Sequence, residues 1–313
     1  MLKFIARRLL ALVPILLLMS VVVFLMLRMA KGDPAMAYLQ LSNIPPTDEA
    51  MAEARSSLGL DRPLAVQYVD WLGRALRLDF GISYTSNRPV LEGILRSMPV
   101  TLDLAFKALA VTLLVSFPLG ILAALRKDRL LDHATRVFAF VGVSLPGFWF
   151  GLMLVTLFSV VLKVLPPMGR GTPAHYIMPL ATLSLMSIAI NIRFIRASLL
   201  EQMKSRSVLY ARSRGLTKGA MLLHVLRNAL LPVVTAIGMH LGELLGGAVI
   251  VENIFAWPGV GRYALFAISN RDYPVLQCFI LFMTVVFVLC TLASDILCAW
   301  LDPRLRLGSG ERQ

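Results

Sequence analysis

The chain is poor in charged residues and in cysteine. Only 16% of its 313 residues are Asp, Glu, Lys or Arg, whereas soluble globular proteins carry about 25%. With 58% apolar residues and a mean hydropathy of +0.75, the sequence indicates an integral membrane protein. The three cysteines, Cys278, Cys290 and Cys298, show no metal-ligand spacing, which argues against a disulfide framework or a zinc module.

Motifs of nucleotide and protease chemistry are also missing. No GxxxxGK[ST] occurs, so the chain has no P-loop with which to hold ATP. No HExxH occurs, and the acids Asp103, Glu243 and Asp295 lie in three different apolar segments without a catalytic motif, which argues against an intramembrane protease. A secondary transporter would use such carboxylates with an ion gradient. Dependence of uptake on ATP distinguishes that alternative from an ATP-driven importer.

Six apolar segments are long enough to cross a hydrocarbon core of about 30 Å, which requires about 20 residues. These predicted spans are residues 9–27, 101–125, 137–162, 176–192, 228–251 and 274–297. The first exceeds the core of a signal peptide and no A-x-A-like cleavage site follows it, so we interpret it as a retained span. SLPGFW at 144–149 is expected to break the third span, because proline and glycine interrupt helices.

The positive charge gathers on one side of this topology. If both termini lie in the cytoplasm, the inner segments hold 18 Lys and Arg against 5 acids, and the outer segments hold 12 against 10. This is the positive-inside distribution, and it predicts an N-in, C-in orientation. It also accounts for the net charge of +13 without a nucleic-acid partner.

We expect four regions along the chain. Residues 1–28 form the N-terminal membrane helix, and the polar stretch 29–98, with an amphipathic segment at 64–78, forms a small extracytoplasmic subdomain of short helices. Residues 99–301 form the main membrane domain with five helices, and residues 302–313 form a cytoplasmic tail.

The inner loop at about 201–230 carries a helical pattern of its own. Residues 210–214 predict a short helix, Gly215 a left-handed stop, and residues 216–226 a second helix, with Pro232 in the first turn of the fifth span. A short basic helix at the membrane surface is suited to docking into a groove of a cytoplasmic partner.

Motifs along nearly the whole chain resemble those of binding-protein-dependent ABC importer permeases of the dipeptide, oligopeptide and nickel family. The resemblance includes an A-R-x-x-G loop pattern ending in Leu-Pro, GDP at 32–34, LGLDRPLAVQY at 58–68, LDFGISY at 78–84, SLPGFW at 144–149, ENIFAWPGVGRYA at 252–264, RDYPVLQ at 271–277 and DPR at 302–304.

The resemblance implies an all-α membrane protein with the type I ABC importer permease fold, located in the bacterial inner membrane. It implies a transporter subunit rather than an enzyme, without a cofactor of its own. ATP and Mg²⁺ would be used by two separate cytoplasmic ATPase subunits. The other expected partners are a second homologous permease and an extracytoplasmic binding protein, with alternating access as the mechanism.

Within that family the inner loop contacts the ATPase. The motif's Glu and first Ala fall here on Leu209 and Tyr210, so we expect docking through shape, apolar contact and arginine. The residues predicted to couple are Tyr210, Ala211, Arg212, Arg214, Gly215 and Pro232.

His240 and Glu243 are candidates to meet the substrate. They are three residues apart and share a helix face near the middle of the fifth span, where ionisable side chains usually face a bundle interior or a water-filled path. Imidazole and carboxylate suit Ni²⁺, and the pattern GMH-x-GE resembles nickel-type permeases. Nickel, free or chelated, is therefore the preferred substrate, and di- or oligopeptides are the alternative. Three roles stay open for this pair: mutual hydrogen bonding, shaping of a polar path, or direct ligation of metal in transit.

Further residues are candidates for the path and for its outer mouth. Asp103 is expected to pair with Lys107 near a helix N-terminus capped by Ser97, with Pro99 in the first turn. Ser144 and Pro146 are gate candidates, and Cys278 is either a path residue or a small apolar filler. Composition and family position predict an outer-mouth segment that meets the binding protein, with Glu252, Asn253, Trp257, Pro258, Gly259, Gly261 and Arg262.

Overall fold

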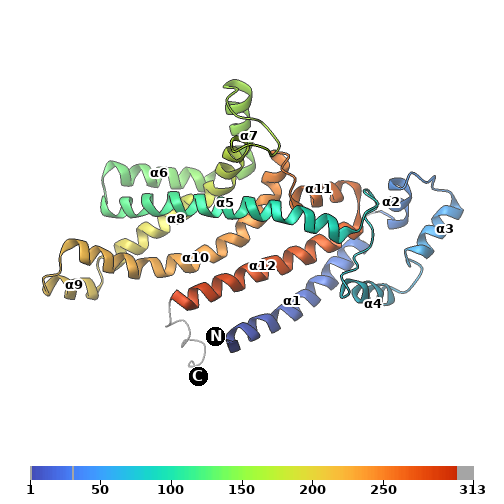
Figure 1. The fold of residues 1–313 in the computed structure, drawn as a ribbon, viewed down its shortest axis with the longest axis horizontal. Coiled ribbons are helices and arrows are strands. Elements are labelled where there is room, and N and C mark those ends of the chain that lie inside the picture. The colour runs from blue at the N-terminus through green and yellow to red at the C-terminus, as the bar shows by residue number, and fades with distance from the viewer. Residues whose placement is uncertain (1, 30–31, 302–313) are drawn as a thin grey trace. The chain divides into compact units, whose positions relative to one another are not determined.

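The computed structural model describes residues 2–29 and 32–301, together with most of their side chains. The regular elements of these residues are helices, and one isolated antiparallel bridge joins Ile82 to Pro89 (Figure 1). The predicted cytoplasmic tail at 302–313 lies outside the described residues.

The chain divides into two compact units. The first comprises Met1–Thr101 and Pro258–Leu289, and the second comprises Leu102–Trp257 and Cys290–Gln313. The helices are α1 (Leu2–Met29), α2 (Pro34–Leu41), α3 (Asp48–Ser57), α4 (Leu64–Ala75), α5 (Val90–Leu125), α6 (Leu130–Ser144), α7 (Gly147–Leu154), the π-helix η1 (Val155–Val161), α8 (Ala174–Gln202), α9 (Arg206–Ser213), α10 (Lys218–Ile254), α11 (Val260–Asn270) and α12 (Tyr273–Leu301).

In the first unit, three short helices follow α1, as the sequence predicted for the polar stretch. Asp33 caps α2 by accepting a hydrogen bond from the amide of Ala35 at 2.9 Å, and its other carboxylate oxygen accepts from Arg55 of α3 at 2.6 Å. The Arg55 hydrogen bond lowers the pKa of Asp33. A small core of Ala35, Leu39 and Ala54 lies between α2 and α3.

An aromatic cluster joins α4 to the last turns of α1. The ring of Phe24 lies 5.5 Å from that of Tyr68 and 5.8 Å from that of Trp71. The hydroxyls of Ser20 and Tyr68 lie 2.8 Å apart. Buried aromatic pairs of this kind contribute about 0.5–1.5 kcal/mol beyond the area that they bury. The amphipathic α4 is therefore fixed against the membrane helix.

Helix α5 begins at Val90, eleven residues before the predicted span. The expectation that Ser97 caps this helix and that Pro99 lies in its first turn is therefore wrong, and Asp103 lies well inside the helix. Helix starts are poorly specified by apolar patterns, because polar residues extend a helix beyond the apolar core of a span without changing that pattern.

The predicted break in the third span is confirmed. Helix α6 ends at Ser144, α7 begins at Gly147, and the two are bent by 104°. Pro146 is the N-cap of α7, and Leu145 before it adopts an extended conformation, because proline disfavours the helical region for the preceding residue. Residues 137–162 thus form a broken span or a re-entrant segment rather than one straight helix.

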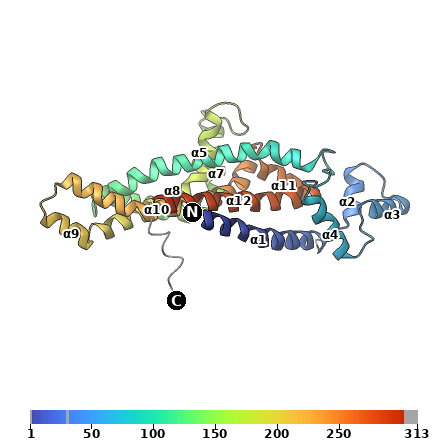
Figure 2. The ribbon, with the colours of Figure 1, turned by 60° about the horizontal axis from the view of Figure 1, so that its bottom comes forward.

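In the second unit, α8 packs against α6, α7 and α10. Figure 2 shows α9 at the end shared by α8 and α10. Helix α10 runs unbroken for 37 residues, a length of about 55 Å. The predicted division into a helix at 216–226 and a fifth span starting near Pro232 is therefore wrong. An interior proline removes one helical hydrogen bond, at a cost of about 3 kcal/mol, and packing against α8 opposes that cost.

Four helices among the described residues are long and apolar enough to cross a membrane, and the bent pair makes up to a fifth. The four are Leu9–Met29, Val90–Leu125, Ala174–Gln202 and Tyr273–Ser294. Each contains all or most of a predicted span. The remaining predicted span, at 228–251, falls within α10, where the side chains of 231–239 lie outside the description. The count of six spans and the orientation stay predictions.

Candidate functional site

The predicted coupling loop contains α9 and the turn into α10. Gly215 has a φ of +75°, and the amide of Leu216 donates to the carbonyl of Ala211 at 3.3 Å. A left-handed glycine with this bond is the usual way to end a helix, so the predicted left-handed stop is confirmed. The side chain of Thr217 then accepts from the amide of Ala220 and caps α10.

A small apolar core holds this turn in place. Buried residues of α5, α8 and α10 pack together, and Val208 of α9 contacts them from the side. Ala211 of α9 is buried. The buried residues of this core are Ala124, Ile195, Leu199, Val225 and Ala229. The position of α9 is therefore set by the ends of three long helices, α5, α8 and α10, that pack together there.

The outer face of α9 is apolar and exposed. The side chains of Leu209 and Tyr210 are 70% and 65% exposed, and the Arg214 guanidinium lies 5.8 Å from the centre of the Tyr210 ring. Leu209 and Tyr210 therefore form an apolar protrusion, with the positive charge of Arg214 beside it. The side chains of Arg212 and Pro232 lie outside the part of the structure that is described.

His240 of α10 is buried and has a partner at each ring nitrogen. Its Nδ1 lies 2.9 Å from a carboxylate oxygen of Glu243, and its Nε2 lies 2.9 Å from the Asn191 side-chain oxygen on α8. The Glu243 side chain is 60% exposed, whereas Asn191 is 1% exposed. The predicted contact between His240 and Glu243 is present, and Asn191 extends it to the neighbouring helix.

With Glu243 as a hydrogen-bond acceptor, two proton arrangements fit this geometry. A doubly protonated imidazole donates to both Glu243 and Asn191. Alternatively, the Asn191 amide is turned over, so that its nitrogen donates to Nε2 while Nδ1–H donates to Glu243. In the orientation of the structure, the Asn191 side-chain nitrogen is buried without a hydrogen-bond partner. Turning the amide over gives this nitrogen a partner, the Nε2 of His240. In both arrangements a metal ion reaches a His240 nitrogen only by displacing Asn191 or Glu243.

Asp103 of α5 lies at the centre of a second polar cluster. Its carboxylate is 2.8 Å from the Lys107 ammonium, accepts from the Tyr176 hydroxyl at 2.8 Å, and lies 3.6 Å from the Arg170 guanidinium. The predicted pair with Lys107 is therefore confirmed. Arg170 donates to the Tyr176 hydroxyl, and this bond raises the pKa of Arg170.

The same cluster reaches Trp257 of the predicted outer-mouth segment. The Trp257 ring packs edge-to-face on that of Tyr176, with ring centres 4.7 Å apart, and it is fully buried. Asp103, predicted for the path, and Trp257, predicted for the outer mouth, therefore belong to one set of contacts through Tyr176 and Arg170.

Of the other predicted outer-mouth residues, some are buried and some are exposed. Glu252 and Asn253 lie in the last turn of α10, and Glu252 is buried. Gly259 caps α11, and Gly261 in the first turn of that helix is buried. Pro258 and Arg262 are exposed. These two are therefore the predicted residues that a partner can reach directly in this conformation.

Ser144, Pro146 and Cys278 complete the predicted path residues. Ser144 and Pro146 are exposed at the break between α6 and α7, and the Ser144 hydroxyl donates to the Phe140 carbonyl at 2.9 Å. Cys278 of α12 is fully buried, in agreement with its interpretation as a filler. Within the described residues, no group of three or more His, Cys, Asp or Glu side chains is placed to hold a metal ion.

Sequence reasoning missed several partners. A hydrogen-bond partner for Asn191 could have been suspected from the sequence, because placing an amide within an apolar span costs free energy unless the amide is hydrogen-bonded. A buried ion pair between Asp132 of α6 and Arg196 of α8, with one bond at 2.8 Å, had no signal because 64 residues separate the two. Tyr176 and Arg170 are likewise distant in sequence from Asp103.

Comparison with known proteins adds independent information. The family model described as binding-protein-dependent transport system inner membrane component matches residues 116–307, and the model of the family's N-terminal part matches residues 1–105. Together they cover nearly the whole chain.

Two relatives are similar over their full length. The metal-staphylopine import system permease protein CntB of Staphylococcus aureus (strain NCTC 8325 / PS 47) is 36% identical over 310 residues, which are 99% of this chain and 100% of that protein. The glutathione transport system permease protein GsiC of Escherichia coli (strain K12) is 38% identical over 308 residues, which are 98% of this chain and 99% of that protein.

Among solved structures, the inward-facing MetNI methionine ABC transporter has a similar fold. It matches with a TM-score of 0.55 and 16% identity, over 67% of this chain and 96% of its own. At that identity the likeness concerns the fold alone. The family models and the two full-length relatives show that the chain belongs to the binding-protein-dependent transport system inner membrane component family, the permease subunits of ABC importers.

Proposed function

We propose that the chain forms the translocation path for nickel, which a binding protein delivers as a complex with a small organic chelator. The second candidate substrate is a di- or oligopeptide. As a family member the chain is a multi-pass inner membrane permease of an ABC importer, and it is not an enzyme. ATP is used by partner ATPase subunits.

The polar contact of His240 with Asn191 and Glu243 is the observation that carries the proposal. It places an imidazole, an amide and a carboxylate at the contact of α8 and α10, the closely packed pair in the second unit. Since both ring nitrogens have protein partners 2.9 Å away, the group is suited to line a polar path rather than to ligate a bare ion. This favours a chelated metal over free Ni²⁺.

The relatives support the two candidates to a similar degree. One relative is named for the import of a metal bound to staphylopine and the other for the transport of glutathione, at 36% and 38% identity. The first name includes a metal, and glutathione in the second is a peptide. A path lined by amide, imidazole and carboxylate groups is compatible with either, so the substrate has to be determined by uptake measurements.

For the mechanism we propose alternating access driven through α9. A loaded binding protein docks outside, and ATP binding and hydrolysis in the two ATPases move the inner loop. The exposed Leu209 and Tyr210 would enter a groove of the ATPase, and Arg214 would border it. The buried core beneath α9 then passes the movement to the inner ends of α5, α8 and α10. This role requires both termini in the cytoplasm and a second homologous permease beside this chain.

Uptake of radioactive nickel and of labelled peptides in a deletion strain tests the substrate. The strain carries the wild-type chain, a variant combining His240→Leu with Glu243→Gln, or the control His133→Leu, which removes an exposed histidine of α6. We expect chelated nickel to enter with the wild type and the control, and several times more slowly with the double variant.

Three results are decisive. Uptake of peptides without nickel would replace the nickel proposal by the second candidate. Unchanged nickel uptake in the double variant would leave His240 and Glu243 with a structural role only. Uptake that persists after deletion of the ATPase genes would overturn the coupling mechanism.

A further inference from the structure

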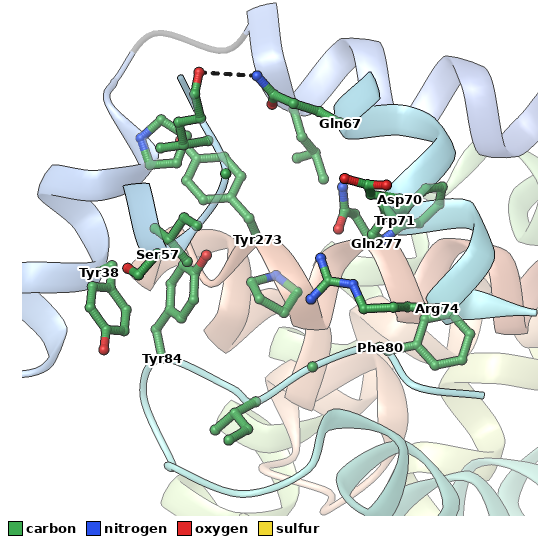
Figure 3. A pocket seen from close by; sticks show the side chains of 18 of the residues that line it. Tyr38, Ser57, Gln67, Asp70, Trp71, Arg74, Phe80, Tyr84, Tyr273 and Gln277 are labelled. Carbon is green, nitrogen blue, oxygen red and sulfur yellow. Dashed lines mark hydrogen bonds between the residues drawn. The ribbon is translucent and has the colours of Figure 1, made fainter. Parts of the chain in front are cut away.

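A large cavity lies in the first unit. Its volume is about 780 Å³, within the range of about 300–1,000 Å³ that is typical of small-molecule sites. Figure 3 shows its walls, which come from the end of α1, from α2 to α4, from the segment at 79–87 and from the start of α12. None of the motifs assigned to coupling or to the path lies in it.

Charged groups in the lining leave an excess of positive charge. Three arginines and two aspartates line the cavity. Arg62 is neutralised by Asp70, with their side chains 2.8 Å apart. Arg28 and Arg74 have no ion pair with a carboxylate in the part of the chain that the structure describes, and Figure 3 shows Arg74 reaching into the cavity from α4 near Gln277. The excess of one positive charge favours a ligand with net negative charge.

The remaining acid, Asp79, favours a ligand that also carries a positive group. One of its oxygens accepts from the amide of Gly81 at 3.0 Å, and the second oxygen is left for a ligand. A phosphate group alone would satisfy the arginines but would meet Asp79 as a like charge. A zwitterion with one more carboxylate than ammonium groups matches all three side chains.

Aromatic and amide groups complete the lining. The aromatic residues there are Tyr38, Trp71, Phe80, Tyr84 and Tyr273. The Trp71 indole N–H and the Gln67 amide oxygen are buried without hydrogen-bond partners, and Trp71 is 7% exposed. Aromatic walls accept flat or apolar side chains and ammonium groups.

We propose that this cavity is a binding site for a small, acidic, peptide-like solute on the extracytoplasmic side of the permease. Arg28 and Arg74 bind its carboxylates, Asp79 faces its ammonium group, and the aromatic residues hold its side chain. The site lies in a different unit from the His240 cluster, so it does not depend on which substrate the path carries.

Equilibrium binding to the complete importer in nanodiscs of zwitterionic lipid, without the binding protein, tests the site. The probes are three dipeptides that share phenylalanine and differ in net charge: Asp-Phe, Gly-Phe and Lys-Phe. We expect Asp-Phe to bind best and Lys-Phe to bind worst. Arg74→Gln should weaken Asp-Phe binding about tenfold, equivalent to about 1.4 kcal/mol.

Arg77→Gln is the matched control. Arg77 is exposed, lies three residues after Arg74 and does not line the cavity, so the same loss of charge there should leave binding unchanged. Equal affinities in Arg74→Gln and the wild type, or no binding of Asp-Phe at millimolar concentration, would overturn the proposal. Displacement of Asp-Phe by phosphatidylglycerol in the nanodisc, but not by soluble glycerol phosphate, would assign the cavity to a lipid instead. Nickel and peptide uptake are measured separately, so a failure here leaves the proposed transport function standing.

Discussion

Replacing Gly215 by valine should uncouple transport from ATP hydrolysis while the protein still reaches the membrane. The residue ends α9 with a φ of +75°. A Cβ built there would meet no atom within 4 Å, so the effect of the substitution comes from the backbone conformation and not from a clash of the Cβ.

The left-handed conformation costs a residue with a Cβ about 1–2 kcal/mol of conformational free energy. For a β-branched residue the cost lies at the upper end of that range. Such a free energy lowers the equilibrium constant between the native turn and its alternatives by roughly fivefold to thirtyfold. If α9 docks only with this turn in place, that factor is the upper limit of the loss in coupled uptake. Asparagine tolerates the left-handed region, so the loss should rise from Gly215→Asn through Gly215→Ala to Gly215→Val.

Proteoliposomes containing the complete importer provide the assay, with uptake and ATP hydrolysis measured together and membrane abundance as a check. Gly219→Val is the control, because Gly219 lies in the first turn of α10 and also has open space around it. Normal uptake with Gly215→Val, or an equal loss with Gly219→Val, would refute the role given to this turn.

Three further predictions concern stability, and each is measured as the thermal midpoint of the purified protein. Asp132→Leu should cost about 3–5 kcal/mol, because it leaves the largely covered Arg196 guanidinium without its carboxylate, and adding Arg196→Met should recover most of the loss. The stabilisation that Asp33 gains from its lowered pKa is complete above the usual value of 3.8 and disappears as the pH falls below it, so the difference between wild type and Asp33→Asn should shrink on acidification to about pH 3. Gly93→Ala should cost about 1–3 kcal/mol, because the new Cβ would lie 2.7 Å from the Tyr263 hydroxyl and 2.9 Å from its Cζ. In a Tyr263→Ala background, which lacks the ring, the same change should cost much less; an unchanged penalty there would contradict the contact.

Features that depend on neighbouring residues were predicted correctly. The break at Ser144, the left-handed stop at Gly215 and the contacts Asp103–Lys107 and His240–Glu243 each involve residues no more than four positions apart. Proline and glycine act on their own backbone, and the helical repeat of 3.6 residues brings positions three and four apart together. Such features follow from local geometry in whatever fold contains them.

Helix boundaries were predicted less well, because apolar patterns mark the core of a span and not its ends. Helix α5 starts at Val90, and α10 continues through Pro232. The continuous helix at Pro232 reflects packing against α8, and that packing is not visible in the local sequence.

The sequence by itself determined the membrane character, the family resemblance and the local turns, since composition and short motifs suffice for these. Only the tertiary structure decided which side chains meet across helices. Asn191 lies 49 residues from His240, Tyr176 lies 73 residues from Asp103, and the cavity lined by Arg74 is assembled from segments at both ends of the chain. The physical reason is that a buried polar group requires a partner, but the partner is selected by the packing of whole helices and not by its position along the chain.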